Sequence, residues 1–150
     1  MPKPIPDGYH SVTPHLTVSN ADKAIAFYKA ALDAKELYRM PMPDGRVGHA
    51  ELQIGDVRIM LADESPQMGN KSPRSVGGSP VSLCIYTADV ESMVARFMKA
   101  GGKQLSPLEN KFYGDRAGNY QDPEGYTWTL MQHVEDVSPE EMKKRMANMK

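Results

Sequence analysis

Three side chains that could bind a metal or move a proton stand in strand-like stretches of the sequence. His15 lies in SVTPHLTV, which alternates apolar and polar residues, Cys84 lies in PVSLCIYT, and His133 ends YTWTLMQH. Imidazole and thiolate groups are common zinc ligands, and imidazole is also a frequent general base near neutral pH. Residue type alone leaves three roles open for His15: a metal ligand, a polar pocket lining or a structural side chain.

A second candidate pair is His49 and Glu51 in VGHAELQI. Residues two apart on a strand share a face. A carboxylate beside an imidazole orients it and raises its pKa, as a general-base pair requires. Exposed strand faces also carry such pairs without any catalytic role, so both interpretations stay open.

The block FYGDR at residues 112–116 brings an aromatic ring, a carboxylate and a guanidinium together. Arg116 could hold a carboxylate or phosphate through two hydrogen bonds, and Tyr113 could stack or donate a hydrogen bond. The alternative is an internal Asp115–Arg116 ion pair that shapes the loop. Cys84 could be a nucleophile if His15 lies close to it, but a lone strand cysteine is more often a small buried apolar residue.

Composition excludes several classes of protein. The chain has 150 residues, 40% of them hydrophobic, and a net charge of -1, which suits a globular domain without the basic excess of nucleic-acid binders. We find no apolar run long enough to span a bilayer and no apolar signal region in MPKPIPDGYH. The single cysteine excludes an internal disulfide. We expect a cytoplasmic protein that binds neither membrane nor nucleic acid.

The elements that must position these residues repeat once, with an offset of 69 residues. SVTPHLTV precedes a helical pattern whose apolar face includes Ala24, Ile25 and Tyr28, and PVSLCIYT precedes one with Met93 and Phe97. Three strand-like runs follow each helix. The order βαβββ therefore occurs twice, in module one (residues 9–63) and module two (residues 80–134), joined by a Pro/Gly/Ser-rich linker at residues 64–79. The DPEG segment at 122–125 is interpreted as a turn and nothing more.

A last helix is predicted over about residues 138–149. Ser138 can cap it, Pro139 suits its first position, and Glu141 completes a capping box. Its apolar stripe of Met142, Met146 and Met149 predicts packing on the domain or on a dimer mate, with a partner-binding helix as the alternative.

The repeated modules, together with FYKAALDAKELYRMPMPDGRVGHAEL and FYGDRAGNYQDPEGYTW, resemble the vicinal oxygen chelate superfamily of glyoxalases, bleomycin-resistance proteins and dioxygenases. Within it the chain is most similar to bacterial PhnB-like proteins, over residues 9–134. The resemblance implies an α+β fold, in which the mixed sheets of two tandem βαβββ modules curl around a shared cavity. It also implies a single domain over residues 1–150 and a homodimer, often with exchanged modules.

The resemblance also implies where a metal would bind. The four ligand positions of the metal-dependent members fall on Thr13, Met60, Ser82 and Thr129. None of these is a His, Glu or Asp, and hydroxyl and thioether groups are poor ligands for zinc, nickel or iron. We therefore expect no metal or other cofactor. A displaced divalent-metal site built from His15, Cys84, His133 and Glu51 is the alternative.

Strand parity predicts which side chains face the cavity. Apolar Val12, Leu16 and Val18 should face the first helix, which turns Thr13 and His15 inward. Parity on the other strands, together with the two FYGDR candidates chosen by residue type, gives a ligand-binding set of mixed polarity: Thr13, His15, Met60, Ser82, Cys84, Tyr86, Tyr113, Arg116, Thr129 and Met131.

Three functions follow from these residues. The leading hypothesis is a metal-free protein that binds a small organic molecule in its cavity. The second is a divalent-metal-dependent lyase or isomerase of the glyoxalase type, or a dioxygenase-related enzyme. The third is a metal-free acid–base enzyme that uses His15 or His49 with Glu51.

Overall fold

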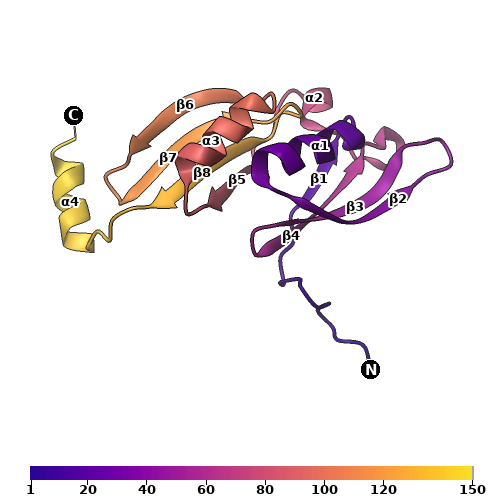
Figure 1. Cartoon of the computed structure of the whole chain (residues 1–150), viewed down its shortest axis with the longest axis horizontal. Coiled ribbons are helices and arrows are strands. Elements are labelled where there is room, and N and C mark those ends of the chain that lie inside the picture. Colours follow the sequence, from indigo (N-terminus) through magenta and orange to yellow (C-terminus); the bar gives the residue numbers. More distant parts are fainter. Residues whose placement is uncertain (150) are drawn as a thin grey trace.

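Two four-stranded sheets, each crossed by one helix, form the body of the chain in the computed structural model, which describes residues 1–149 (Figure 1). The two units lie end to end, and their helices α1 and α3 contact each other on the same side of both sheets (Figure 1). The predicted α+β fold with two βαβββ modules is confirmed.

Both modules have the same strand order and the same mixture of parallel and antiparallel pairs. The sheet orders are β1-β4-β3-β2 and β5-β8-β7-β6, with the first pair of each sheet parallel and the others antiparallel. Module one contains β1 (His15–Val18), α1 (Ala21–Leu32), β2 (Lys35–Pro41), β3 (Val47–Ile54) and β4 (Val57–Asp63). Module two contains β5 (Ser82–Tyr86), α3 (Val90–Lys99), β6 (Lys103–Asn110), β7 (Asp115–Gln121) and β8 (Thr127–His133).

Side chains cap the N-terminal ends of both helices. The Asn20 side chain accepts a hydrogen bond from the Lys23 amide, and the Asp89 side chain accepts one from the Ser92 amide. The first helix ends at Asp33, which adopts a left-handed conformation with φ 54°. Caps of this kind fix the helix register, and so they fix which helix face packs on the sheet.

The hydrophobic core lies between the sheets and the two helices, and it runs through the junction of the modules. Phe27 of α1 meets Phe97 of α3 edge to face, with ring centroids 5.0 Å apart. Tyr28 packs against Trp128 of β8 at 5.6 Å. Because these aromatic pairs join α1 to module two, the modules share one continuous core.

The segments outside the modules differ in part from expectation. Val12 was expected to face the helix, but it precedes β1 and is 84% exposed. The linker contains a short 3-10 turn (Pro66–Met68) and α2 (Pro73–Val76), in which buried Ser72 donates a hydrogen bond to Glu64. The last helix, α4 (Pro139–Ala147), has the predicted Ser138 cap and buries none of its own residues.

Across residues 1–149, no helix combines the length and the apolar character needed to cross a membrane.

Candidate functional site

The predicted site residues of module one gather on the sheet face that points away from the helices, which we call open face one. Leu16, Ile59 and Leu61 are buried beneath the helices, so the residues that alternate with them lie on the other face. His15 and Met60 are direct neighbours in the parallel β1–β4 pair. Thr13 stands just before β1, outside the strand.

Strand β3 brings His49 and Glu51 onto the same open face one. Glu51 pairs with Met60 across the β3–β4 ladder, which places it in one row with His15. The His49 Nε2 atom lies 3.3 Å from a Glu51 carboxylate oxygen. Partial burial lowers the pKa of His15, and the nearby His49 imidazole lowers it further. His15 is therefore a neutral hydrogen-bond partner or weak base on this face.

Module two presents an equivalent surface, open face two. Ser82, Cys84 and Tyr86 are exposed on β5, while the alternating Leu83 and Ile85 pack on the core. Cys84 is therefore not the buried apolar residue that lone cysteines usually are. Thr129 is its neighbour on β8 and donates a hydrogen bond to Asn119 at 2.7 Å. Met131 follows beside Tyr86 in the same parallel pair.

Residues of the FYGDR block lie on opposite sides of the second sheet. Tyr113 lies close enough to Tyr86 to contribute to the raised pKa of its phenol. Arg116 lies on the helix side of β7, where it forms an ion pair with Glu91 of α3 and donates a hydrogen bond to Asn110. Arg116 thus does not join open face two, and its ion-pair partner is Glu91 rather than Asp115.

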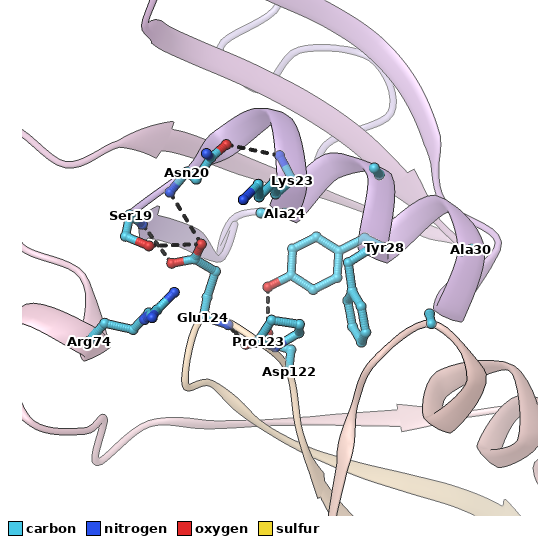
Figure 2. Close-up of a pocket in the computed structure, with 13 residues that line it drawn as sticks. Ser19, Asn20, Lys23, Ala24, Tyr28, Ala30, Arg74, Asp122, Pro123 and Glu124 are labelled. Carbon is cyan, nitrogen blue, oxygen red and sulfur yellow. Dashed lines mark hydrogen bonds between the residues drawn. The ribbon is translucent and has the colours of Figure 1, made fainter.

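The DPEG segment is more than a turn, which corrects the expectation from sequence. Asp122 is buried and accepts four hydrogen bonds, from the Tyr28 hydroxyl, the Trp128 indole and the amides of Glu124 and Tyr126. Figure 2 shows the contact of Asp122 with Tyr28 across the junction of the modules.

Glu124 continues this junction at the start of α1. Its buried carboxylate accepts hydrogen bonds from the Ser19 amide and hydroxyl and from the Asn20 amide (Figure 2). Tyr126 adds a third link, because its hydroxyl donates to the Thr17 carbonyl at 2.8 Å. Three side chains from one turn of module two therefore fix the orientation of β1 and α1.

Two cavities flank this junction within one chain. One, of about 590 Å³, lies between α1, Arg74 and the DPEG segment (Figure 2). The other, of about 550 Å³, lies between the β3–β4 hairpin and β5, and Cys84 and Tyr86 contribute to its wall. Neither cavity is lined by both open faces, so the described part of a single chain does not enclose the expected shared cavity.

Comparison with known protein families identifies the family of this chain. The model of the Glyoxalase/Bleomycin resistance protein/Dioxygenase superfamily matches residues 8–130. The chain belongs to this superfamily. The resemblance inferred from the sequence is thereby confirmed.

Relatives within the superfamily cover most of the chain. An uncharacterised protein of Mycobacterium bovis is 42% identical over 141 residues, which span 92% of this chain and 93% of that protein. A PhnB protein from Bacillus cereus superposes with a TM-score of 0.63 at 19% identity, over 82% of this chain and 99% of its own. The fosfomycin resistance protein FosX of Listeria monocytogenes, in complex with Mn(II) and a dihydroxypropylphosphonic acid, gives 0.62 at 18%, over 89% and 94%. Both structural likenesses show a shared fold.

The four positions to which the resemblance assigns metal ligands carry hydroxyl and thioether groups. Met60 offers a thioether, and the Thr129 hydroxyl donates its proton to Asn119. Ser82 lies one pair before Cys84 on β5, and Thr13 precedes β1. Neutral groups of this kind give a divalent cation neither charge nor strong basicity. Among residues 1–149, no three His, Cys, Asp or Glu side chains form an alternative cluster, so His15, Cys84, His133 and Glu51 do not converge within one chain.

Sequence reasoning missed Asp115 as a member of the site. It starts β7, is only 5% exposed, and contacts both Tyr86 and His133 on open face two. The parity of residues 111–121 could not be assigned because Gly114, Ala117 and Gly118 interrupt the apolar alternation. A carboxylate two residues before a buried Ala117 was the available signal.

Proposed function

We propose that this superfamily member binds a small organic molecule between open face one of one chain and open face two of a second chain, without a metal. The observation that carries the proposal is the mixed character of the uncovered side chains. Met60 and the ring of Tyr86 supply adaptable apolar surface, and His15, the Tyr86 hydroxyl and Thr129 supply polar groups. Ligand pockets combine apolar walls with a few placed polar groups in this way.

A second chain is part of the proposal because several side chains on the strands are exposed to solvent in a single chain. Tyr38 and Met40 on β2 and Tyr86 on β5 are 50%, 39% and 61% exposed, although all three belong to strands. Strands β1 and β5 each pair on one side only. Uncovered apolar side chains beside free strand edges are typical of surfaces that a partner covers. A homodimer that brings open face one against open face two would enclose the ligand.

A screen of thermal unfolding against small aromatic and aliphatic compounds, in buffer that contains a metal chelator, tests the proposal. We expect a subset of compounds to raise the melting temperature of the native protein. The same compounds should act at least fivefold more weakly on Met60→Arg, which fills open face one. Lys143→Ala on exposed α4 is the matched control and should respond like the native chain. A screen in which no compound stabilises the chelated protein would contradict the proposal.

A second candidate function is acid–base catalysis on the bound molecule. It is favoured by the convergence of His15, His49 and Glu51 in neighbouring rows of open face one. A neutral imidazole beside a carboxylate-paired one can accept a proton from a ligand. This candidate predicts that Glu51→Gln retains ligand-induced stabilisation but loses turnover. If the protein were instead a metal-dependent lyase of the glyoxalase type, the chelator would remove its metal. Compounds would then no longer raise its melting temperature in that buffer.

A further inference from the structure

At the far end of open face two, one buried carboxylate holds two other side chains that can donate or accept protons. Asp115 opens β7, and its side chain is 7% exposed. One of its oxygens accepts the Tyr86 hydroxyl at 2.8 Å, and the other lies 2.8 Å from Nδ1 of His133. The three residues come from β5, β7 and β8, so the sheet itself fixes their arrangement.

The contacts define where the protons are. A carboxylate only accepts hydrogen bonds, so Nδ1 of His133 must carry a proton toward Asp115. The other ring nitrogen, Nε2, lies 2.7 Å from the Asp136 carboxylate and therefore also donates. Hydrogen bonds that His133 donates to Asp115 and then to Asp136 raise its pKa. The two contacts therefore favour the protonated imidazole, in which Nε2 carries a proton.

The two carboxylates around His133 differ in how firmly they are held. Asp115 is enclosed, whereas the Asp136 side chain is 100% exposed and the His133 side chain is 51% exposed. An exposed ion pair contributes little stability and exchanges readily with other anions. The Nε2 proton of His133 is therefore available to an anionic ligand that displaces Asp136.

Tyr86 supplies the complementary half of this subsite. Its proton is donated to Asp115, so its oxygen keeps lone pairs that can accept a hydrogen bond. Tyr86 and His133 bind opposite oxygens of the same carboxylate, which keeps them close together. Tyr113 and Cys84 lie near the Tyr86 phenol, and neither is a cation that would compete for the anion.

We propose that Tyr86 and His133, positioned by Asp115, form a subsite for a small carboxylate that carries a hydrogen-bond donor, such as a hydroxyl, on the neighbouring carbon. The carboxylate accepts from Nε2 of His133, and the hydroxyl donates to the Tyr86 oxygen. The exposed rings of Tyr86 and Tyr113 offer an apolar surface for the rest of the molecule. The inference rests on the proposed function, because this subsite would be one end of the same ligand-binding surface.

The test uses mandelate, phenylacetate and 2-phenylethanol as matched probes on the full-length protein. Phenylacetate lacks the hydroxyl of mandelate, and 2-phenylethanol has a neutral hydroxymethyl group in place of the carboxylate of phenylacetate. Imidazole ¹⁵N chemical shifts of the four histidines report binding at His133 and, separately, on open face one. We expect mandelate to shift His133 Nε2 and to bind about fivefold more tightly than phenylacetate, as one added hydrogen bond provides. The shift with 2-phenylethanol should be absent.

Variants distinguish a ligand subsite from a merely structural cluster. In Tyr86→Phe, mandelate and phenylacetate should bind equally, within twofold. In Asp136→Asn, the competing carboxylate is gone, so mandelate should bind more tightly than in the native chain. Equal binding of the two acids to the native chain, or no shift of His133 at saturating mandelate, would overturn the subsite. Hydroxy acids that stabilise the protein in the thermal screen but bind without moving His133 would overturn it while leaving the proposed function intact.

Discussion

At the scale of single residues, Asp122 shows how much of this structure depends on one carboxylate. Each of its oxygens accepts two hydrogen bonds, and the donors come from both modules. Burial raises the pKa of Asp122, and its hydrogen bonds offset only part of that effect. Asp122 therefore joins the modules at a cost in desolvation free energy. The positions of its two acceptor oxygens consequently matter more than its negative charge.

Replacement of Asp122 by Asn tests this role. The amide NH₂ group would face two donors whichever way it is oriented, and leaving buried donors unpaired costs about 1–3 kcal/mol. We expect the free energy of unfolding in urea to fall by about 2 kcal/mol at pH 7. Asp56→Asn, in an exposed turn, is the control and should change it by less than about 0.5 kcal/mol. Equal effects of the two substitutions would show that Asp122 does not hold the junction.

The native protein and Asp122→Asn should also differ in how their free energy of unfolding depends on pH, and the sign of this difference is defined. Because the pKa of Asp122 is raised in the folded chain, the folded state takes up this proton at a higher pH than the unfolded state. Its contribution to stability therefore grows as the pH falls through that interval and is smallest at neutral pH. The difference in unfolding free energy between native protein and Asp122→Asn should be larger at pH 5 than at pH 7. A difference that shrinks on acidification would contradict the raised pKa.

The candidate site was predictable wherever apolar alternation was regular. On β4 and β8, buried residues such as Leu61 and Leu130 fixed the parity, so Met60 and Thr129 were placed on the correct face. Arg116 and Asp115 were not, because small residues on β7 hide its alternation. The roles of Asp122 and Glu124 were invisible for another reason: their partners lie about 100 residues away, at Tyr28 and Ser19.

At the scale of elements, Gly114 connects the β6–β7 hairpin to the segment that leads to α4. It has φ 106°, and a Cβ atom there would collide with the Glu135 carbonyl oxygen. The Gly114 carbonyl accepts hydrogen bonds from the amides of Val134 and Glu135. Arg145 of α4 completes the connection through Glu135 and the Phe112 carbonyl. This glycine therefore positions the segment that carries Asp136 beside His133.

Gly114→Ala should detach that segment. Strain from the positive φ costs about 1–2 kcal/mol in any such substitution, and the backbone clash adds to it. The control is Gly45→Ala, where φ is 87° but no atom lies within 4 Å of the added Cβ. We expect faster amide hydrogen exchange over residues 134–147 in Gly114→Ala only. Unchanged exchange there would show that α4 is held by Arg145 alone.

Most of the fold could be predicted at this scale. The 69-residue repeat, its apolar helix faces and the predicted cap at Ser138 defined the helices and the order of the strands. The repeat is visible in the pairing itself, since Leu16 pairs with Leu61 and Ile85 with Leu130. The end-to-end arrangement of the modules could not be predicted, because it depends on long-range contacts of Phe27 and Tyr28 that periodicity does not encode.

At the scale of the whole molecule, the proposed dimer makes a simple prediction of mass. Analytical ultracentrifugation should give about 33 kDa, which is twice the 16.6 kDa of one chain. Exposed Met146 on α4 and Met149 after its end are not required for this interface in the proposed arrangement. A chain truncated before Pro139 should therefore still sediment as a dimer, whereas a native protein that sediments at 16.6 kDa would contradict the arrangement.

A mixing experiment decides whether one ligand site is built from two chains. Met60→Arg disables open face one, and Cys84→Arg disables open face two; both side chains lie on surfaces that are uncovered in a single chain. If the faces that meet come from different chains, a mixed dimer of the two variants contains one intact site and one doubly altered site. Refolding an equimolar mixture should therefore restore about a quarter of the native binding capacity for a compound from the thermal screen. Neither variant refolded alone should bind the compound. If the two faces of the same chain met, the mixture would bind no better than either variant, because every site would carry one of the two substitutions.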